Sequence, residues 1–236
     1  MLRSLRFGEA DRVLHLYTLG RGRVGAMAKG IRKTRSRFGA RLEPLSHVQI
    51  ALHLGRGELA TVTGVDLVRS HQAARDDPYR LGVGLAGAEA MLKLFQEEEA
   101  NERAFLALAR FLDLADDVPR RATEPRLDPL ALAFQLKLLW LAGYLPHLES
   151  CTECGADAAL VAYSPRAGGA VCRSCARDDA IPLSPAGLQG IWGLLRRPLA
   201  EAGDAPLGQR ASREALRLIV ASHEFHGGFR LRTLAR

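Results

Sequence analysis

Four cysteines in two close pairs are the residues of this sequence with the clearest chemical meaning. The pairs read Cys-Thr-Glu-Cys and Cys-Arg-Ser-Cys, with seventeen residues between them. Two C-x2-C pairs about 15–20 residues apart are typical of zinc sites. Four thiolates complete a tetrahedral shell and leave no open position for water. The spacing therefore predicts one structural Zn²⁺ ion, held by Cys151, Cys154, Cys172 and Cys175.

Disulfides are the alternative for the same cysteines. The opening segment, Met1 to Arg12, lacks the apolar core of a secretory signal. Because disulfides persist mainly in oxidising compartments, the metal interpretation is favoured and a cytoplasmic location is expected. Residues 151–180 are too few to bury a core of their own. We therefore expect a zinc-binding insert, although a relic site that needs no metal stays open.

A basic loop, Lys29 to Arg41, is the second group that could do chemistry. It holds six basic residues and no acidic one in thirteen positions. Arginine binds phosphate through two parallel hydrogen bonds, and a polyanion that engages several cations releases counterions. The pattern predicts a grip for nucleic acid, although a solvated charge run without a partner is the alternative. The predicted contacts are Lys29, Arg32, Lys33, Arg35, Arg37 and Arg41.

The charge distribution supports a nucleic-acid partner. The formal charge is +7, and the first 70 residues hold 13 basic and 5 acidic residues, against 20 and 21 in the remainder. A basic region on a nearly neutral body suggests nucleic acid or an anionic membrane surface. No run of about 18 apolar residues is present, and the basic loop has no apolar helical stripe. A membrane partner is therefore not expected.

Short strands should position the basic loop. Apolar and β-branched residues predict strands near 2–7, 13–19, 23–29 and 59–68, while Val48, Ile50, Leu52 and Leu54 alternate with a period of two. Gly64 suggests a bulge or bend. An OB-type barrel, whose face and loops bind oligonucleotides, is the first candidate, with an SH3-like barrel as the alternative. In such a barrel Phe38 or Tyr17 could stack on a base, but either could equally be core.

One glycine motif is a weak signal. Gly20, Gly22 and Gly25 match G-x-G-x-x-G, but no βαβ unit of about 30 residues surrounds them. We expect turn glycines between two strands, not a cofactor site.

The rest of the chain has helical periodicity. Helices are predicted from Tyr79 to an acidic tip at Glu99, from Ala104 to Leu114, from Pro129 to Leu141, from Pro185 to Arg197 and from Ala211 to Phe225. Asp128 and Ser184 are the expected caps of the two helices that open with proline. Trp140 is expected in the core, and Phe225 is expected at an apolar position of the last helix.

Two further features have both a functional and a structural interpretation. Arg196 and Arg197 end a helix, where cations complement the dipole, and they could also contact DNA. The segment His223 to His226 is not H-E-x-x-H, since its histidines are three apart. It is interpreted as surface or helix-end chemistry.

The fold class predicted is α+β with more than one domain: an N-terminal OB-type β-barrel followed by an α-helical domain with a four-Cys zinc-knuckle insert. The expected domains are 1–76 for the DNA-binding barrel, 77–150 with 181–236 for the helical domain, and 151–180 for the insert.

Several local sequences together resemble the RecO family of bacterial recombination mediators. The resemblance covers nearly the whole chain and is densest in 7–70 and 134–180. The similar segments are Phe7-Gly8-Glu9-Ala10-Asp11-Arg12, Ala28-Lys29-Gly30-Ile31-Arg32-Lys33, Ser36-Arg37-Phe38-Gly39, Gly55-Arg56-Gly57-Glu58-Leu59 and Leu141-Ala142-Gly143-Tyr144-Leu145-Pro146.

The resemblance implies a non-enzymatic protein of DNA repair and recombination. It would bind single- and double-stranded DNA, anneal complementary strands, and work with RecR to help RecA replace the single-stranded DNA-binding protein. The acidic C-terminal tail of that protein would dock on the helical domain. A nucleoid-associated cytoplasmic location follows, with no membrane or small-molecule substrate. Some family members lack the cysteines, so zinc need not be obligatory for activity.

Two other functions stay open at this point. An RNA-binding OB protein with a zinc knuckle fits the same barrel and charges. A nucleic-acid enzyme would need a carboxylate cluster, a true phosphate loop or a paired nucleophile, and the sequence offers none of them.

Overall fold

The computed structural model describes residues 1–33, 36, 38–55, 57–157 and 159–235. The chain forms two compact units, Met1–Asp117 and Val118–Arg236. The predicted DNA contacts at Arg35 and Arg37 lie outside the described residues, as do Thr34 and Arg56. The first unit contains three helices as well as the strands, and the predicted domain bounds stay a prediction.

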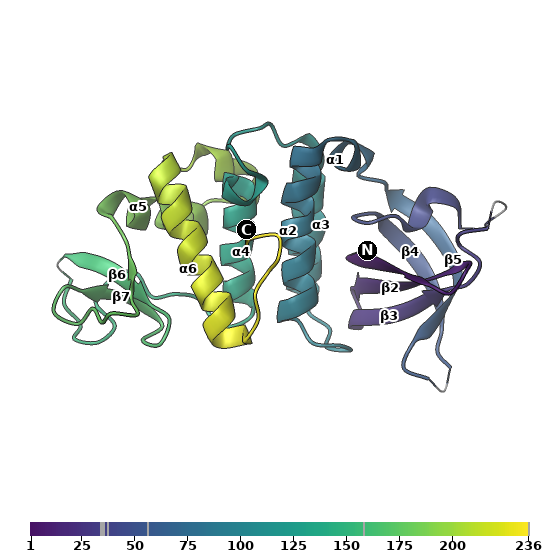
Figure 1. Ribbon diagram of the computed structural model, residues 1–236, viewed down its shortest axis with the longest axis horizontal. Helices are drawn as coiled ribbons and strands as arrows, with labels where there is room; N and C mark the ends of the chain where they lie inside the picture. Colours follow the sequence, from purple (N-terminus) through teal and green to yellow (C-terminus); the bar gives the residue numbers. More distant parts are fainter. Residues whose placement is uncertain (34–35, 37, 56, 158, 236) are drawn as a thin grey trace. The chain divides into compact units, whose positions relative to one another are not determined.

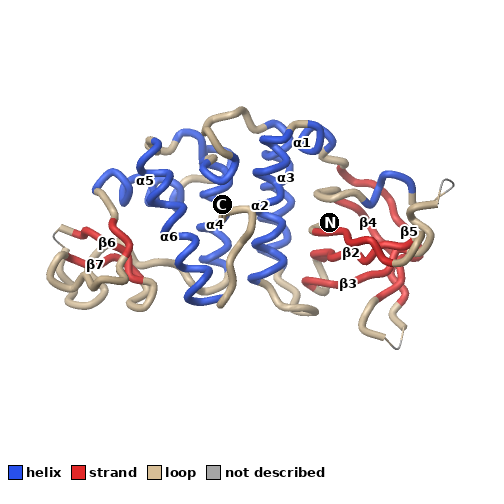
Figure 2. The backbone as a smooth tube through the Cα atoms, viewed as in Figure 1, coloured by secondary structure: helices blue, strands red, loops and turns tan. Residues whose placement is uncertain are grey.

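A five-stranded sheet forms the core of the first unit (Figures 1 and 2). Its order is β1-β2-β3-β5-β4, with β3 and β5 parallel over two residue pairs and the other neighbours antiparallel. The expected five strands are confirmed. Their bounds are β1 (Arg3–Phe7), β2 (Asp11–Thr18), β3 (Gly22–Ala28), β4 (His47–His53) and β5 (Ala60–Arg69).

The two edge strands of this sheet, β1 and β4, approach each other at one end. The Leu45 amide, just before β4, donates to the Met1 carbonyl at 3.0 Å. No ladder between β1 and β4 is present among the described residues, so the closed OB barrel stays a prediction.

Alternating apolar residues build the core of this sheet. Leu14 and Leu16 of β2 and Val24 and Ala26 of β3 are buried, because side chains at every second position share one face. Near Gly64 the pairing changes register, from Ala51 opposite Gly64 to Leu52 opposite Val62. This extra residue confirms the expected bulge. Leu54, which was expected on the half-buried face, lies beyond the end of β4 and is exposed.

The glycine motif lies in the β2–β3 hairpin. Gly22 has φ +61°, and a Cβ placed there would lie 1.9 Å from the Glu99 carbonyl oxygen. Glycine is therefore required both for the turn and for the close approach of a second segment. The following residues continue as β3, which confirms turn glycines.

Three helices complete the first unit: α1 (Gln72–Asp76), α2 (Pro78–Leu94) and α3 (Glu102–Asp117). α2 ends five residues before its predicted end at Glu99, so that boundary was wrong. Carboxylates disfavour a helix C-terminus, and this acidic segment instead lies against β3. Glu97 pairs with Arg23 at 3.2 Å, and the Glu98 carboxylate pairs with Arg21 at 2.6 Å.

Helices also dominate the second unit. Their bounds are α4 (Pro129–Leu141), α5 (Pro185–Arg196) and α6 (Gln209–Gly227), and short 3-10 turns lie at η2 (Pro125–Leu127) and η3 (Leu199–Asp204), with η1 (Gly39–Leu42) in the first unit. The Asp128 carboxylate accepts from the Leu130 amide at 2.8 Å, and the Ser184 hydroxyl accepts from the Gly187 amide at 3.1 Å. Both predicted caps are confirmed.

Three side chains of this unit lie differently from their predictions. Trp140 is 53% exposed and Phe225 is 54% exposed, so neither is core. His223 is only 1% exposed and bonds Gln135 through Nε2 at 3.0 Å, so the surface interpretation was wrong for it. The helix-end alternative holds, since α6 ends at Gly227. The periodicity places both aromatic residues on an apolar face, but it does not show whether other elements cover that face near the end of each helix.

A small sheet forms the insert between α4 and α5 (Figure 1). Its strands β6 (Leu160–Ser164), β7 (Gly169–Cys172) and β8 (Ile181–Pro182) have the order β7-β6-β8. On β6, Ala162 packs beside Cys151. The next residue, Tyr163, is buried and its hydroxyl hydrogen-bonds that of Ser222 on α6 at 2.7 Å. The insert is thus anchored to the helices through one strand.

Candidate metal centre and nucleic-acid interface

The four cysteines converge on one point. All four Sγ atoms lie within 4.8 Å of one another, and those of Cys154 and Cys172 are 3.9 Å apart. Sulfurs at about 2.3 Å from a tetrahedral zinc would lie about 3.8 Å from each other. The cluster therefore has the size and ligand chemistry of a structural Zn²⁺ site. The structure brings together Cys151, Cys154, Cys172 and Cys175, as the spacing predicted.

Tight turns of the backbone place these sulfurs. Gly155 has φ +74° and donates its N–H to the Cys151 carbonyl at 2.8 Å. The second pair turns in the same way, since the Cys175 amide donates to the Cys172 carbonyl at 3.1 Å. The Cys172 amide also donates to the Cys151 Sγ at 3.4 Å, which joins the two turns.

The ionisation of the thiols shows why this cluster suits a cation. Hydrogen bonds from backbone amides, that of Cys172 first, lower the pKa of Cys151 to about 6. The neighbouring thiols of Cys172 and Cys154 raise the pKa of Cys175 to about 12. Four thiolates cannot share this space without a positive charge, so the cluster has the electrostatics of a cation site.

The basic loop has a fixed base. Gly30 has φ +67° and donates its N–H to the Asp11 carboxylate at 2.7 Å, and the Arg32 amide donates to the Ala10 carbonyl at 2.9 Å. The loop is thereby tied to the β1–β2 turn. The side chains of Lys29, Arg32 and Lys33 are exposed. Three of the predicted phosphate contacts therefore point into solvent from one anchored segment.

Other residues of the loop have structural roles. Arg41 is exposed, yet its Nη1 donates to the Val65 carbonyl on β5 at 2.8 Å. Phe38 is 1% exposed and belongs to the sheet's core. Tyr17 is buried, with its ring centroid 5.6 Å from that of Phe95. Neither aromatic ring presents a face to a base, so the stacking interpretation was wrong and the core alternative holds.

Arg196 and Arg197 belong to the second unit. The Arg196 guanidinium lies over the Trp192 ring, 4.6 Å from its centroid. The Arg197 Nη1 donates to the Gly193 carbonyl at 3.3 Å, in the last turn of α5. The Gly193 carbonyl also accepts the Arg197 amide at 3.3 Å, so Arg197 closes this helix end with both its backbone and its side chain. Arg196 lines a groove.

This groove was not predicted from the sequence. It has a volume of about 270 Å³ and apolar walls with two cations at its rim. Lys137 donates from Nζ to the Leu195 carbonyl at 3.1 Å, and burial lowers its pKa. The sequence signals were Lys137 and Trp140 in a mostly apolar helix and Arg196 at the end of another. The lining residues are Lys137, Trp140, Leu145, Pro146, Trp192, Leu195 and Arg196.

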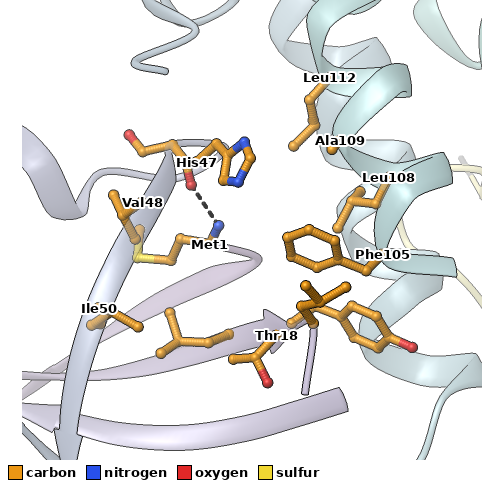
Figure 3. A pocket seen from close by; sticks show the side chains of 13 residues that line it. Met1, Thr18, His47, Val48, Ile50, Phe105, Leu108, Ala109 and Leu112 are labelled. Carbon is orange, nitrogen blue, oxygen red and sulfur yellow. Dashed lines mark hydrogen bonds between the residues drawn. The ribbon is translucent and has the colours of Figure 1, made fainter. Parts of the chain in front are cut away.

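A second hollow lies in the first unit, between the sheet and α3. Figure 3 shows Phe105, Leu108 and Leu112 of α3 facing Val48 and Ile50 of β4. Its volume is about 220 Å³. Its lining is mostly apolar, and no lysine or arginine of the described residues belongs to it.

Comparisons with known proteins agree with this architecture. Residues 1–71 match the family described as Recombination protein O N terminal, and residues 75–235 match Recombination protein O C terminal. The chain belongs to the RecO family. Its resemblance to that family, first seen in short segments, is confirmed over almost its full length.

Curated relatives named DNA repair protein RecO cover most of the chain. The protein of Rubrobacter xylanophilus is 40% identical over 94% of this chain and 88% of its own length. That of Thermobifida fusca is 37% identical over 96% and 90%, and that of Anaeromyxobacter sp. strain K is 35% identical over 98% and 91%.

Family membership assigns this protein to DNA repair and recombination. The four-cysteine cluster fits the zinc binding expected from the spacing. None of the helices in the described part of the chain has both the length and the apolar character needed to cross a lipid bilayer.

Proposed function

We propose that this protein is a non-enzymatic mediator that binds single- and double-stranded DNA and anneals complementary strands. With RecR, it helps RecA replace the single-stranded DNA-binding protein on DNA. It acts in the cytoplasm, associated with the nucleoid, without a membrane or a small-molecule substrate. The observation that carries the proposal is the anchored basic loop, whose cations Lys29, Arg32 and Lys33 are exposed.

The electrostatics of the loop support DNA as its ligand. Among the described residues, no carboxylate lies within ion-pair distance of Lys29, Arg32 or Lys33, so these cations remain available to phosphates. Phosphate contacts carry no base information, and a mediator must act on any sequence. Arg35, Arg37 and Arg41 would add to the same grip.

Annealing follows from charge neutralisation and needs no catalytic group. Two complementary strands repel each other through their phosphates, and a cationic surface lowers that repulsion while it releases counterions. Bases that are not held by the protein stay free to pair. The burial of Phe38 and Tyr17 supports a grip that is confined to the backbone.

The groove of the second unit is the proposed dock for the acidic C-terminal tail of the single-stranded DNA-binding protein. Its apolar walls include Trp140 and Trp192, and Lys137 and Arg196 supply positive charge. An acidic peptide with an apolar end complements both features. Arg196 therefore serves the protein partner in this proposal, while the alternative of a DNA contact stays open for Arg196 and Arg197.

One bound Zn²⁺ is proposed at the cysteine cluster. Its four thiolate ligands fill the shell, so it would stabilise the insert and would not activate water.

The test is the fluorescence anisotropy of a labelled single-stranded oligonucleotide, measured against salt concentration. The variant carries Arg32→Glu, Lys33→Glu, Arg35→Glu and Arg37→Glu. We expect binding at least about 100-fold weaker at 0.1 M salt, and a log–log salt slope reduced by about 3. A control with equal charge change carries Arg103→Glu, Arg110→Glu, Arg213→Glu and Arg217→Glu, all exposed on α3 and α6. It should retain most of the affinity.

Each alternative function predicts a different result. Equal binding by the loop variant and the wild type would refute the loop as the DNA grip. Preference for RNA over DNA in competition would favour an RNA-binding protein. Cleavage of labelled DNA with Mg²⁺ would favour an enzyme.

A further inference from the structure

We propose that metal binding at the cysteine cluster controls the affinity of the groove for acidic peptides. This inference rests on the proposed function of the groove. The cluster and the groove belong to the same unit, and one short segment, residues 144–150, runs from one to the other.

The metal side of this connection is strand β7. The His147 amide donates to the Gly168 carbonyl at 3.0 Å, and the Ala170 amide donates to the His147 carbonyl at 2.7 Å. Ala170 lies two residues before Cys172 on β7. The Thr152 amide, next to Cys151, donates to the Ala170 carbonyl at 3.0 Å. The backbone at residue 147 is therefore held by the strand that carries one of the metal ligands.

The residues just before His147 connect it to the groove. Leu145 and Pro146 form one wall of the groove and directly precede His147. At its other end this wall is tied to α4, since the Tyr144 amide donates to the Leu139 carbonyl at 2.7 Å. The wall thus has two supports, and one of them is the metal-bearing strand.

The same segment also carries a competing charge. The Glu149 carboxylate lies 3.9 Å from the Arg196 guanidinium, at the rim of the groove. Glu149 is two residues before Cys151, so its position depends on the first cysteine turn. A change in this turn would alter both the shape of the wall and the charge that an acidic peptide meets.

The helices do not depend on the metal in the same way. Tyr163 joins β6 to Ser222 on α6, and the core of the three helices is built from their own apolar residues. β7 has only four residues, and the insert is too short for a core of its own. Loss of the metal should therefore release β7 and residue 147 first, and leave the floor of the groove in place.

Coupling between two sites of one protein is commonly about 5- to 150-fold in affinity, and it is reciprocal. We expect the zinc-loaded protein to bind an acidic, apolar peptide about tenfold more tightly than the metal-free protein. By linkage, saturating peptide should raise the affinity for zinc by the same factor.

The experiment uses the full chain and a fluorescein-labelled peptide, Asp-Asp-Asp-Leu-Leu-Phe with a free C-terminal carboxylate. Peptide affinity is measured by anisotropy for the zinc-loaded and the chelator-treated protein. Zinc affinity is measured by competition with a chromophoric chelator, with and without peptide. If circular dichroism shows that the metal-free protein has lost its helices, the peptide affinity of a zinc-loaded variant with an altered connection decides.

A variant tests the connection with the metal still bound. A Cβ at Gly169 would lie 2.2 Å from the His147 carbonyl oxygen and 2.6 Å from the Thr152 Cγ2, so Gly169→Ala must displace residue 147 while it keeps all four cysteines. Because Thr152 is next to Cys151, the zinc content of the variant is measured as well. The variant should retain zinc and lose about tenfold in peptide affinity. Gly64→Ala is the matched control, because its methyl would meet only the Ala51 Cβ at 3.5 Å.

Three outcomes separate the two proposals. Tighter binding by the zinc-loaded protein, with the reciprocal effect on zinc, supports the coupling. Equal binding by both forms overturns the coupling and leaves the groove as a peptide site. No binding by either form overturns the groove's proposed function, and the coupling with it.

Discussion

The basic loop and the cysteine cluster each gather groups of like charge, but they hold them in opposite ways. In the cluster, backbone turns bring four sulfurs to within 4.8 Å of one another. In the loop, the Gly30 and Arg32 amides, the buried Phe38 and the bond from Arg41 to β5 hold the backbone, while the side chains of Lys29, Arg32 and Lys33 stay in solvent.

This difference separates a stabilising site from a recognition site. Converging thiolates need one small cation, and once it is bound the shell is closed. Dispersed cations on a surface stay hydrated and cost the fold little free energy when no ligand is bound. They can exchange their counterions for a polyanion of any sequence. The first arrangement should govern folding and the second should govern binding. Metal removal and substitution of Arg41 test that division, and acid tests the stability of the helical unit apart from its metal.

Metal removal should destabilise the second unit strongly. The binding free energy of a structural zinc is on the order of 10 kcal/mol, and it contributes directly to folding. We expect chelation to lower the thermal midpoint by at least about 10 °C in scanning calorimetry. The oligonucleotide affinity of the basic loop should change little at temperatures below that transition. An unchanged melting curve would contradict the structural role of the metal.

Acid should destabilise the protein through His223, because burial disfavours the protonated form of this side chain. Burial, and then the charge of His226, lower the pKa of His223 from 6.5 to about 4. Between these values the unfolded chain binds the proton and the folded chain does not. The stabilisation is therefore complete above about pH 6.5 and is lost as the pH falls to about 4, by about 3 kcal/mol.

Urea unfolding at a series of pH values measures this effect. His223→Gln keeps a donor for Gln135 but has no titrating group, so its stability should depend less on pH in this window. His53→Gln, at an exposed position on β4, is the control and should retain the wild-type dependence. A variant at 223 with the wild-type slope would show that another group is responsible.

Arg41 should contribute a little both to stability and to DNA binding. Arg41→Gln removes a positive charge and the hydrogen bond to the Val65 carbonyl, so it should lower stability by about 1 kcal/mol and reduce the DNA salt slope by about 1. Arg32→Gln is the matched variant, since among the described residues the Arg32 side chain makes only a 3.5 Å contact with the Gly8 carbonyl. It should weaken DNA binding alone. A loss of stability of equal size in both variants would remove the distinction between them.

Local patterns were sufficient for many elements. The caps at Asp128 and Ser184, the bulge at Gly64 and the meeting of the cysteines were all predicted, because each depends on residues that are close in sequence or on a fixed ligand spacing. The helix boundary at Leu94 was missed, since three adjacent glutamates were interpreted as a solvated helix end.

Burial of single side chains could not be predicted in the same way. Periodicity assigns a residue to a face, but it does not say whether another element covers that face. Trp140 lies on an apolar helix and is exposed, whereas His223 lies near a helix end and is buried. Phe38 is core within a charged loop.

The sequence by itself determined the family, the four cysteines that converge, the sign and place of the charge excess, and most of the strands and helices. These properties depend on residue type and short spacing. Only the tertiary structure decided which aromatic rings are core, that Arg41 is tied to β5, and that a groove forms where α4, α5 and the segment before Cys151 meet. The groove joins residues as distant as Lys137 and Arg196, and only the packing of the folded chain brings such residues together.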